Sequence, residues 1–307
     1  VGACARAGTH YLDLTGEVPF MRRSLRTWHD TAQRTGARIV HASGYDSIPS
    51  DLGVAFLQDQ LTRSGGPAGQ VVTAVVQLRG AASGGTLASM MAILDDAVHD
   101  RELRRALAKP YTLDPEGTPP GPDGRDQTAP RWDPLLRRWT APWFMEPVNS
   151  RVVRRSHALR GRPWGEDFRY RETLATGRGV GGRVRALGIT AGLGAFLGAA
   201  STPWLREHLL PRLLPAPGEG PDAAAREAGS FRHHVVGKRG DALHTAVVSG
   251  PKDPGYGSTA LLLGEATLHV ATQDPSLPDA AGVLTPATGL GLGLVPRLRE
   301  VGLTFEL

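Results

Sequence analysis

Two short apolar runs near the start of the chain each lead into polar residues and glycines. Residues 11–14 and 37–42 are predicted strands, and residues 18–35 between them carry apolar side chains at helical spacing. A further helix is predicted from about residue 49 to residue 61. Strand, helix, strand and helix at these intervals, with apolar rather than alternating strands, are typical of a parallel sheet covered by helices. The first 62 residues are therefore predicted to form part of an α/β layer.

The polar residues that follow the two predicted strands are the candidate binding site. Open α/β sheets bind ligands outside the carboxyl ends of their strands, so we expect both groups to border one crevice. The residues concerned are Thr15, Gly16 and Glu17 after the first strand, and Gly44, Tyr45, Asp46 and Ser47 after the second. The alternative is helix capping, by Thr15 at one helix and by Asp46 or Ser47 at the next, with Glu17 favoured near a helix N-terminus.

Composition places the chain among ordinary globular proteins. The 307 residues are 40% hydrophobic and 21% charged, which suits one large domain or two modest ones. Cys4 is the single cysteine, so no internal disulfide can form and a reducing compartment is expected. The first residues show no secretory signal pattern. We therefore expect a cytoplasmic protein.

The excess of basic residues is concentrated in residues 131–185, which hold thirteen arginines against five acids. Such a segment favours an anionic partner: a phosphate, a lipid head group or an acidic carrier protein. No nucleic-acid-binding motif accompanies it, so a nucleic-acid partner is not expected. His233, His234 and His244 lie on a predicted hairpin, but no carboxylate or cysteine completes a ligand set, and no metal site is predicted.

Four glycine-rich or apolar stretches in the rest of the chain allow more than one interpretation. Ser83, Gly84, Gly85 and Thr86 open a helix after a predicted strand at 71–79, either as an anion-approaching loop or as a capped helix after a flexible joint. The G-x-G-x-x-G at Gly177, Gly179 and Gly182 has no acid until Glu207 and is interpreted as a loop. Residues 184–205 have the length of a membrane span but contain Arg185, which favours a buried or interfacial helix. A last helix is predicted from Thr285 and Pro286, with Gly289, Gly291 and Gly293 inside it.

The segments ACARAGTHYLDLTGE (3–17) and GYDSIPSDLG (44–53) resemble the saccharopine dehydrogenase-like oxidoreductases, in particular their trans-acting enoyl reductase branch. The resemblance continues through SGGTLASMMAILDDA, PAPGEGP and TPATGLGLGLVPRL. It implies an α/β fold: an incomplete Rossmann-type parallel sheet, an inserted α+β substrate domain, and a C-terminal helix returning to the Rossmann part. The expected boundaries are 1–65 for the Rossmann part, 66–283 for the substrate and dimerisation domain, and 284–307 for the helix.

The resemblance also implies an activity. The expected protein is an NAD(P)H-dependent oxidoreductase, with NADPH favoured, that reduces the double bond of a long-chain acyl or polyketide substrate on an acidic carrier protein. Tyr45 or Asp46 would donate or relay a proton. Thr15, Gly16, Glu17, Gly44 and Ser47 would bind the cofactor, and Ser83, Gly84, Gly85 and Thr86 would face the substrate.

Two alternatives stay open: a non-catalytic, lipid- or membrane-associated protein of the same fold, and a saccharopine-type amino-acid dehydrogenase with a compact polar pocket. Peripheral membrane contact through residues 184–214 and a homodimer are further expectations. The family's glycine-rich dinucleotide fingerprint precedes the first motif seen here. We therefore expect a fragment of a longer oxidoreductase that binds NADPH poorly on its own.

Overall fold

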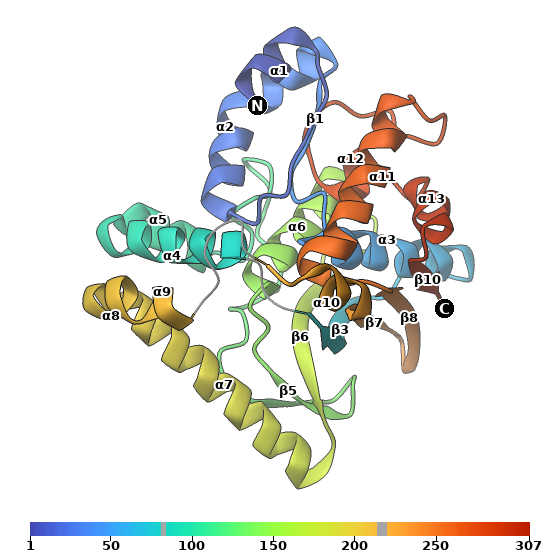
Figure 1. Ribbon diagram of the computed structural model, residues 1–307. Helices are drawn as coiled ribbons and strands as arrows, with labels where there is room; N and C mark the ends of the chain where they lie inside the picture. Colours follow the sequence, from blue (N-terminus) through green and yellow to red (C-terminus); the bar gives the residue numbers. More distant parts are fainter. Residues whose placement is uncertain (81–83, 214–219) are drawn as a thin grey trace.

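The computed structural model describes residues 1–80, 84–213 and 220–307 (Figure 1). A small parallel sheet has the strand order β1-β2-β9, formed by β1 (Tyr11–Leu12), β2 (Arg38–Val40) and β9 (Gly282–Leu284). Two helices pack beside this sheet, α1 (Gly2–Ala7) and α2 (Val18–Thr35). The predicted parallel α/β arrangement of the first part of the chain is confirmed.

A larger, mixed sheet follows in the chain, with the order β10-β8-β7-β3-β6-β5-β4. Its strands are β3 (Gln70–Arg79), β4 (Arg131–Asp133), β5 (Arg138–Ala141), β6 (Arg169–Gly177), β7 (Ser230–Arg239), β8 (Ala242–Gly250) and β10 (Thr304–Glu306). β3 and β6 are parallel, and the other neighbours are antiparallel. The whole of this sheet except β10 lies between β2 and β9 in the chain, so the chain leaves the small sheet and returns to it.

Helix α3 (Ile48–Arg63) lies between the two sheets and explains why they share one core. Most of its residues are buried, and these include the polar Ser50, Asp51 and Gln58 as well as apolar side chains. It packs on β7 and β8 of the large sheet, and on α6 (Glu146–Leu159) and α12 (Pro286–Gly289). One hydrophobic cluster accordingly includes Val40 and Leu284 from the small sheet and Val235 and Val248 from the large one.

The remaining helices surround this core (Figure 1). They are α4 (Gly84–His99), α5 (Arg101–Ala108), α7 (Gly179–Ser201), α8 (Pro203–His208), α9 (Leu210–Leu213), α10 (Ala223–Ala228), the π-helical turn η1 (Pro254–Ser258), α11 (Thr259–Ala271) and α13 (Leu294–Glu300). In Figure 1, α4, α5, α8 and α9 project to the left, and α7 runs diagonally from α8 and α9 to the bottom of the view. Within the described ranges, no helix has the length and apolar character needed to cross a bilayer.

The prediction of a single C-terminal helix is wrong, because this segment forms two helices, α12 and α13. Thr285 caps α12 with a reciprocal capping box, as its position predicts. The chain then breaks at Gly291, which adopts a left-handed φ of 69°, before α13 begins at Leu294. Sequence periodicity missed the break because Leu290, Leu294 and Leu298 are all fully buried on both sides of it. Of the predicted glycine series, Gly289 is the last residue of α12, and Gly291 and Gly293 lie in the junction before α13.

The G-x-G-x-x-G stretch is also more ordered than the predicted loop. Gly177 ends β6 and Gly179 begins α7, both with positive φ. A Cβ on Gly182 would lie 2.5 Å from the Gly177 carbonyl carbon, so the absence of a side chain lets the helix approach the strand. The motif thus forms a tight strand-to-helix turn that does not border the cavity described below.

Candidate active site

The ends of β1 and β2 open onto one large cavity of about 760 Å³, within the range typical of small-molecule sites. The two strand ends are joined beyond the strands themselves, since the Ser43 amide donates to the Asp13 carbonyl (2.8 Å). The walls come from these strand ends, from α4, from the start of α6 and from α7. Most of the lining is apolar: Leu14, Val18, Leu78, Met90, Ile93, Leu107, Trp143, Phe144, Met145, Val148, Leu193 and Leu197.

The structure brings most of the predicted site residues to this cavity. Those that line it are Thr15, Gly16, Glu17, Tyr45, Asp46 and Gly85. Gly44, Ser47 and Gly84 do not appear in its lining. Ser83 lies outside the described residues, and so does the side chain of Thr86. The convergence of the two strand ends therefore takes place as the sheet topology predicts.

Ser47 and Gly44 lie behind the cavity wall and serve the packing of the chain. Ser47 occupies the N-cap position of α3, but its hydroxyl donates to Asn149 Oδ1 (2.9 Å) and makes no capping bond. The capping interpretation is therefore wrong for its side chain. A Cβ on Gly44 would lie 2.6 Å from Leu14 Cδ2, so a larger residue here would displace the Leu14 side chain.

Glu17 stands at the N-cap position of α2, where its side chain makes no capping bond either. Its amide instead donates to Thr15 Oγ1 at 3.3 Å. The alternative that Thr15 caps this helix is therefore wrong, because Glu17 occupies the N-cap position and Thr15 accepts a bond only within the turn that precedes it. Glu17 is one of the residues that line the cavity.

Tyr45 is held by a buried histidine. Its hydroxyl lies 2.9 Å from His233 Nε2, and its ring packs edge-on against Phe231 with centroids 4.8 Å apart. Burial lowers the pKa of His233 to about 3 and raises that of Tyr45 well above its usual value, so both groups are neutral near pH 7. Among the described residues, His233 Nδ1 has no hydrogen-bond partner.

The direction of the hydrogen bond between Tyr45 and His233 depends on the tautomer of His233. With the proton on Nε2, the histidine donates to the Tyr45 oxygen and the phenolic hydrogen is available to a ligand; with the proton on Nδ1, the phenol donates to Nε2. In either tautomer one donor of the pair has no partner among the described residues, so a ligand that accepts from Tyr45 would favour the first tautomer.

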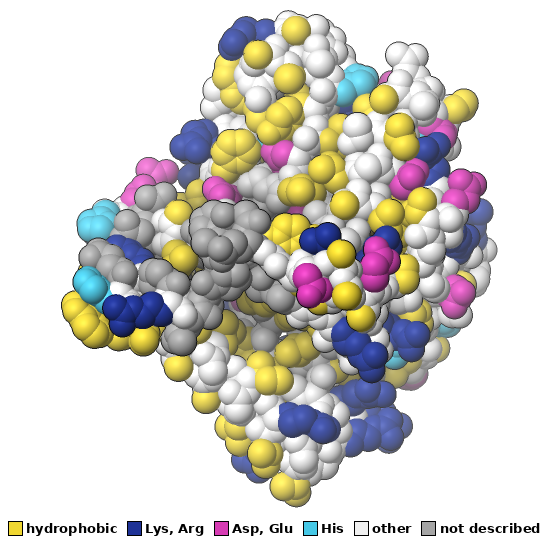
Figure 2. All heavy atoms as spheres, viewed as in Figure 1, with side chains coloured by type: hydrophobic (Ala, Val, Ile, Leu, Met, Phe, Trp, Pro, Cys, Tyr) yellow, Lys and Arg dark blue, Asp and Glu magenta, His cyan; other side chains and the backbone are white. Residues whose placement is uncertain are grey.

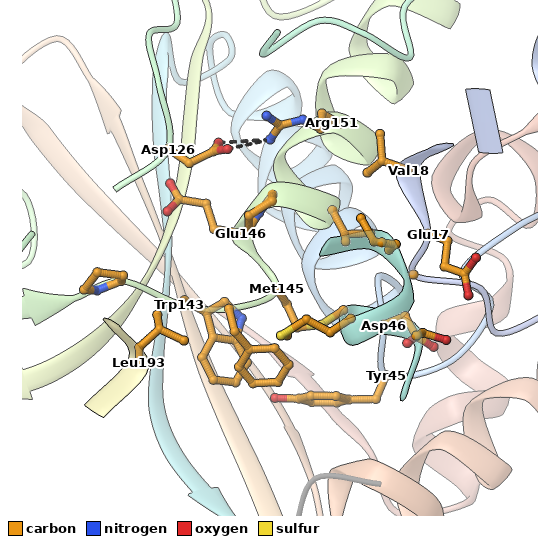
Figure 3. A pocket seen from close by; sticks show the side chains of 18 of the residues that line it. Glu17, Val18, Tyr45, Asp46, Asp126, Trp143, Met145, Glu146, Arg151 and Leu193 are labelled. Atoms are coloured by element: carbon orange, nitrogen blue, oxygen red, sulfur yellow. Dashed lines mark hydrogen bonds and ion pairs between the residues drawn. The ribbon is translucent and has the colours of Figure 1, made fainter. Parts of the chain in front are cut away.

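Asp46 is the second titratable group at this end of the cavity. Burial raises its pKa to about 7, and the nearby charge of Asp13 adds to the rise. A carboxyl with this pKa holds and releases a proton near neutral pH, which is the property needed for general acid–base work. Figure 3 shows Asp46 beside Glu17, with Tyr45 extending below Trp143 and Met145.

A buried chain of polar groups fixes the Thr15–Glu17 turn from behind. His41 lies between Asp13 and Ser24, with Nδ1 2.7 Å from the Asp13 carboxylate and Nε2 2.8 Å from the Ser24 hydroxyl. The other Asp13 oxygen accepts the Thr15 amide (3.0 Å). Burial alone would raise the pKa of Asp13, but the His41 hydrogen bond and charge outweigh it, so the pKa lies below its usual value. Ser24 is buried and does not line the cavity, so this chain positions the turn and is not a hydrolytic triad.

The opposite end of the cavity carries a second polar group, Asp126, Glu146 and Arg151 (Figure 3). Glu146 is 3% exposed and accepts the Gln127 amide at 3.0 Å. Burial raises its pKa to about 8, with a further contribution from the charge of Asp126, so the carboxyl is protonated at pH 7. Sequence reasoning missed these residues, because no local pattern marks them and only the fold brings them to the cavity that Asp46 also lines.

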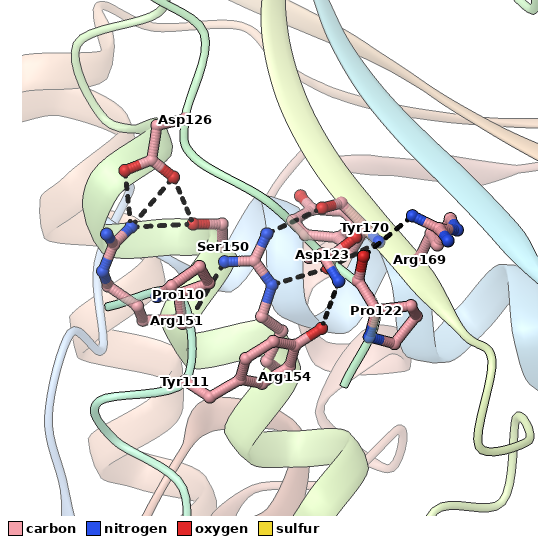
Figure 4. A network of polar contacts seen from close by, with 10 residues as sticks. All are labelled: Pro110, Tyr111, Pro122, Asp123, Asp126, Ser150, Arg151, Arg154, Arg169 and Tyr170. Atoms are coloured by element: carbon pink, nitrogen blue, oxygen red, sulfur yellow. Dashed lines mark hydrogen bonds and ion pairs between the residues drawn. The ribbon is translucent and has the colours of Figure 1, made fainter. Parts of the chain in front are cut away.

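Buried arginines of α6 hold this end in place (Figure 4). Arg151 forms an ion pair with Asp126 (2.8 Å), and Arg154 pairs with Asp123 (2.7 Å) while donating to the Tyr170 carbonyl. Both side chains are at most 4% exposed. These arginines of the basic segment are therefore engaged within the fold and are not available to an anionic partner.

Among the described residues, no three histidine, cysteine, aspartate or glutamate side chains are arranged to hold a metal ion. The fold and the cavity define an α/β protein with a largely apolar ligand site at the carboxyl ends of two parallel strands. No protein-family model matches the chain.

Comparison with curated proteins identifies the family. The chain is 41% identical over 319 aligned positions to Rv2449c of Mycobacterium tuberculosis H37Rv, whose name gives trans-acting enoyl reductase as a provisional assignment; the match covers 100% of this chain and 75% of that protein. It is 37% identical to the trans-acting enoyl reductase of Mycobacterium ulcerans Agy99 (100% and 76% covered). It is 35% identical to that of Mycobacterium bovis BCG Pasteur (99% and 75%). The chain belongs to the trans-acting enoyl reductase family.

Proposed function

We propose that this protein is an NAD(P)H-dependent oxidoreductase that reduces the carbon–carbon double bond of a long acyl or polyketide chain bound in the 760 Å³ cavity. The observation that carries the proposal is a largely apolar cavity at the ends of two parallel strands, lined by the neutral phenol of Tyr45 and by the Asp46 carboxyl, whose pKa is about 7. The names of the relatives supply the reaction class.

The character of the cavity favours an acyl chain over an amino-acid substrate. An α-amino acid carries two charges, and its site needs fixed countercharges for both. Among the lining residues that the structure describes, Arg151 is the one cation, and it is already paired with Asp126. The saccharopine-type alternative expects a compact polar pocket, which does not fit these walls.

The residues present fit the nicotinamide end of a dinucleotide and not its phosphates. Thr15, Gly16, Tyr45 and Asp46 border the crevice where open α/β sheets place such a ring. Among the lining residues that the structure describes, the one cation, Arg151, is already paired with Asp126, which leaves no countercharge for a pyrophosphate. When bound, the cofactor supplies the hydride. We propose NADPH, in preference to NADH, as the hydride donor.

The side chains of this protein orient the substrate and provide the proton. The apolar walls hold the acyl chain and exclude water. The Tyr45 hydroxyl, oriented by His233, donates its hydrogen toward the substrate, and Asp46 restores or relays the proton. Asp13 and His41 keep the Thr15–Glu17 turn in position beside them.

The experiment compares two conservative variants in an assay of NADPH oxidation with a long-chain enoyl thioester. Asp46→Asn removes the titrating group at the cavity, whereas Asp59→Asn removes a carboxylate that pairs with Arg63 on the surface of α3. We expect kcat of the first variant to fall by about 10²- to 10⁴-fold, and kcat of the second to stay unchanged. Wild-type kcat should fall as the pH rises through about 7, because the protonated form of Asp46 is needed. Equal activity of both variants would refute the role of Asp46, and no NADPH oxidation by the wild type would refute the reaction.

A further inference from the structure

Helix α7 presents an apolar stripe to the outside of the molecule. Val180, Val184 and Leu187 are 80%, 60% and 50% exposed, and Ala191 and Ala195 continue the stripe at helical spacing. Figure 2 shows hydrophobic side chains gathered along this edge, over α7 and at the tip of α8. At 1.5 Å per residue the helix is about 34 Å long, so the stripe is an extended surface.

Another face of the same helix, about a third of a turn from the stripe, lines the cavity. Thr190, Leu193, Gly194 and Leu197 belong to the cavity lining. A single helix, about 10 Å across, therefore separates the apolar cavity from the apolar outer stripe. Whatever the stripe contacts lies next to the cavity wall.

Charge and aromatic residues around the stripe indicate its partner. Residues 173–206 contain four arginines and no acid. At one end of α7, Arg183 lies over the Trp139 ring (5.4 Å to the centroid), and Trp139 packs against Trp132, which is 44% exposed. At the other end, Trp204 on α8 is 65% exposed. Tryptophan is enriched at bilayer interfaces, and anionic lipid head groups attract arginine.

We propose that the outer stripe of α7 (Val180, Val184, Leu187, Ala191 and Ala195) lies on the surface of an anionic membrane. The stripe offers no hydrogen-bonding side chain, whereas specific protein interfaces carry about one hydrogen bond per 100–200 Å². A lipid leaflet requires none. Pairing of two copies through this face would bring Arg178 and Arg183 of both copies together, and residues 173–206 contain no acid to neutralise them. The inference goes beyond the proposed function and holds whatever reaction the cavity serves.

The test is flotation of the purified protein with two kinds of vesicle, phosphatidylcholine alone and phosphatidylcholine with about a third phosphatidylglycerol. The variant Val184→Glu/Leu187→Glu places two acids in the stripe. The control Leu243→Glu/Leu268→Glu places two acids at side chains that are 46% and 48% exposed on other elements. All four positions are solvent-exposed, so both variants should fold, which circular dichroism checks.

Wild type and control should bind the phosphatidylglycerol vesicles, and the stripe variant should bind at least about tenfold more weakly. Arg178→Gln/Arg183→Gln should lower the preference for the anionic vesicles by about tenfold. Three results would overturn the inference. The first is absence of vesicle binding by the wild type. The second is an equal loss of vesicle binding in the stripe variant and in the control Leu243→Glu/Leu268→Glu. The third is a wild-type dimer that does not bind vesicles and that the stripe variant converts to a monomer in light scattering.

Discussion

Replacement of Glu146 by glutamine tests whether the cavity wall shields the Glu146 carboxyl from water, as its burial indicates. Glu146 is 3% exposed, and its Oε2 accepts the Gln127 amide. Glutamine has nearly the same shape and keeps an oxygen for that amide, but it cannot ionise. Burial raises the pKa of Glu146 from 4.5 to about 8, so the wild type carries a group that prefers to be ionised only when unfolded.

The sign of the effect follows from proton linkage. Between pH 4.5 and about 8 the folded protein keeps the proton on Glu146, while the unfolded chain releases it. The contribution of this group to stability is therefore full below pH 4.5 and is lost progressively as the pH rises to about 8. Its upper bound is about 5 kcal/mol over the whole window and about 3 kcal/mol by pH 7. Glu146→Gln has no such loss.

The assay is urea unfolding followed by tryptophan fluorescence at several pH values from 4.5 to 8. We expect the free energy of unfolding of Glu146→Gln to exceed that of the wild type by an amount that grows toward about 3 kcal/mol at pH 7. The control Glu116→Gln, whose side chain is 86% exposed, should show a difference that barely changes with pH. If the difference in free energy of unfolding between Glu146→Gln and the wild type does not change with pH, then Glu146 ionises normally and the cavity wall does not shield it from water.

Two further substitutions test separate parts of the account. Tyr45→Phe removes the proposed proton donor and should lower kcat in the enoyl thioester assay by about 10²- to 10⁴-fold while the protein stays folded; an unchanged kcat would exclude the phenol from proton transfer. Asp51→Ala should lower the free energy of unfolding by about 2–4 kcal/mol in urea titrations, because fully buried Asp51 accepts the Ser156 hydroxyl (2.6 Å) and the Ala287 amide (2.8 Å) and both donors would lose their partner; a change below about 0.5 kcal/mol would contradict this.

Local sequence patterns predicted the part of the fold that local chemistry controls. Gly36 ends α2 in a left-handed conformation, and Thr285 caps α12, because each depends on residues within one helical turn. The placement of Glu17 and Tyr45 in the lining of one cavity was predictable too, since parallel strands present their carboxyl ends at one edge of the sheet. The break at Gly291 was not, because the leucines on both sides keep a helical burial pattern.

The other half of the site was beyond sequence reasoning for a physical reason. Glu146 and Leu193 reach the cavity through long-range packing, and no local signal distinguishes them from ordinary helix residues. The same holds for His233, which the hairpin pattern placed on a strand without indicating that Tyr45 would bond to it. Arginine content likewise could not separate Arg154, buried against Asp123, from the arginines near the exposed face of α7.

The most direct test of the central claim, that the apolar cavity is where the acyl chain is reduced, is to fill it. Gly194 lines the cavity, whereas Gly192 lies on the same helix outside it, and a Cβ at either position meets no atom within 4 Å. The measurement is kcat/KM for NADPH-dependent reduction of a long-chain enoyl thioester by Gly194→Trp and Gly192→Trp. The account predicts a fall of at least about tenfold for Gly194→Trp and wild-type activity for Gly192→Trp. Wild-type activity in both variants would contradict it.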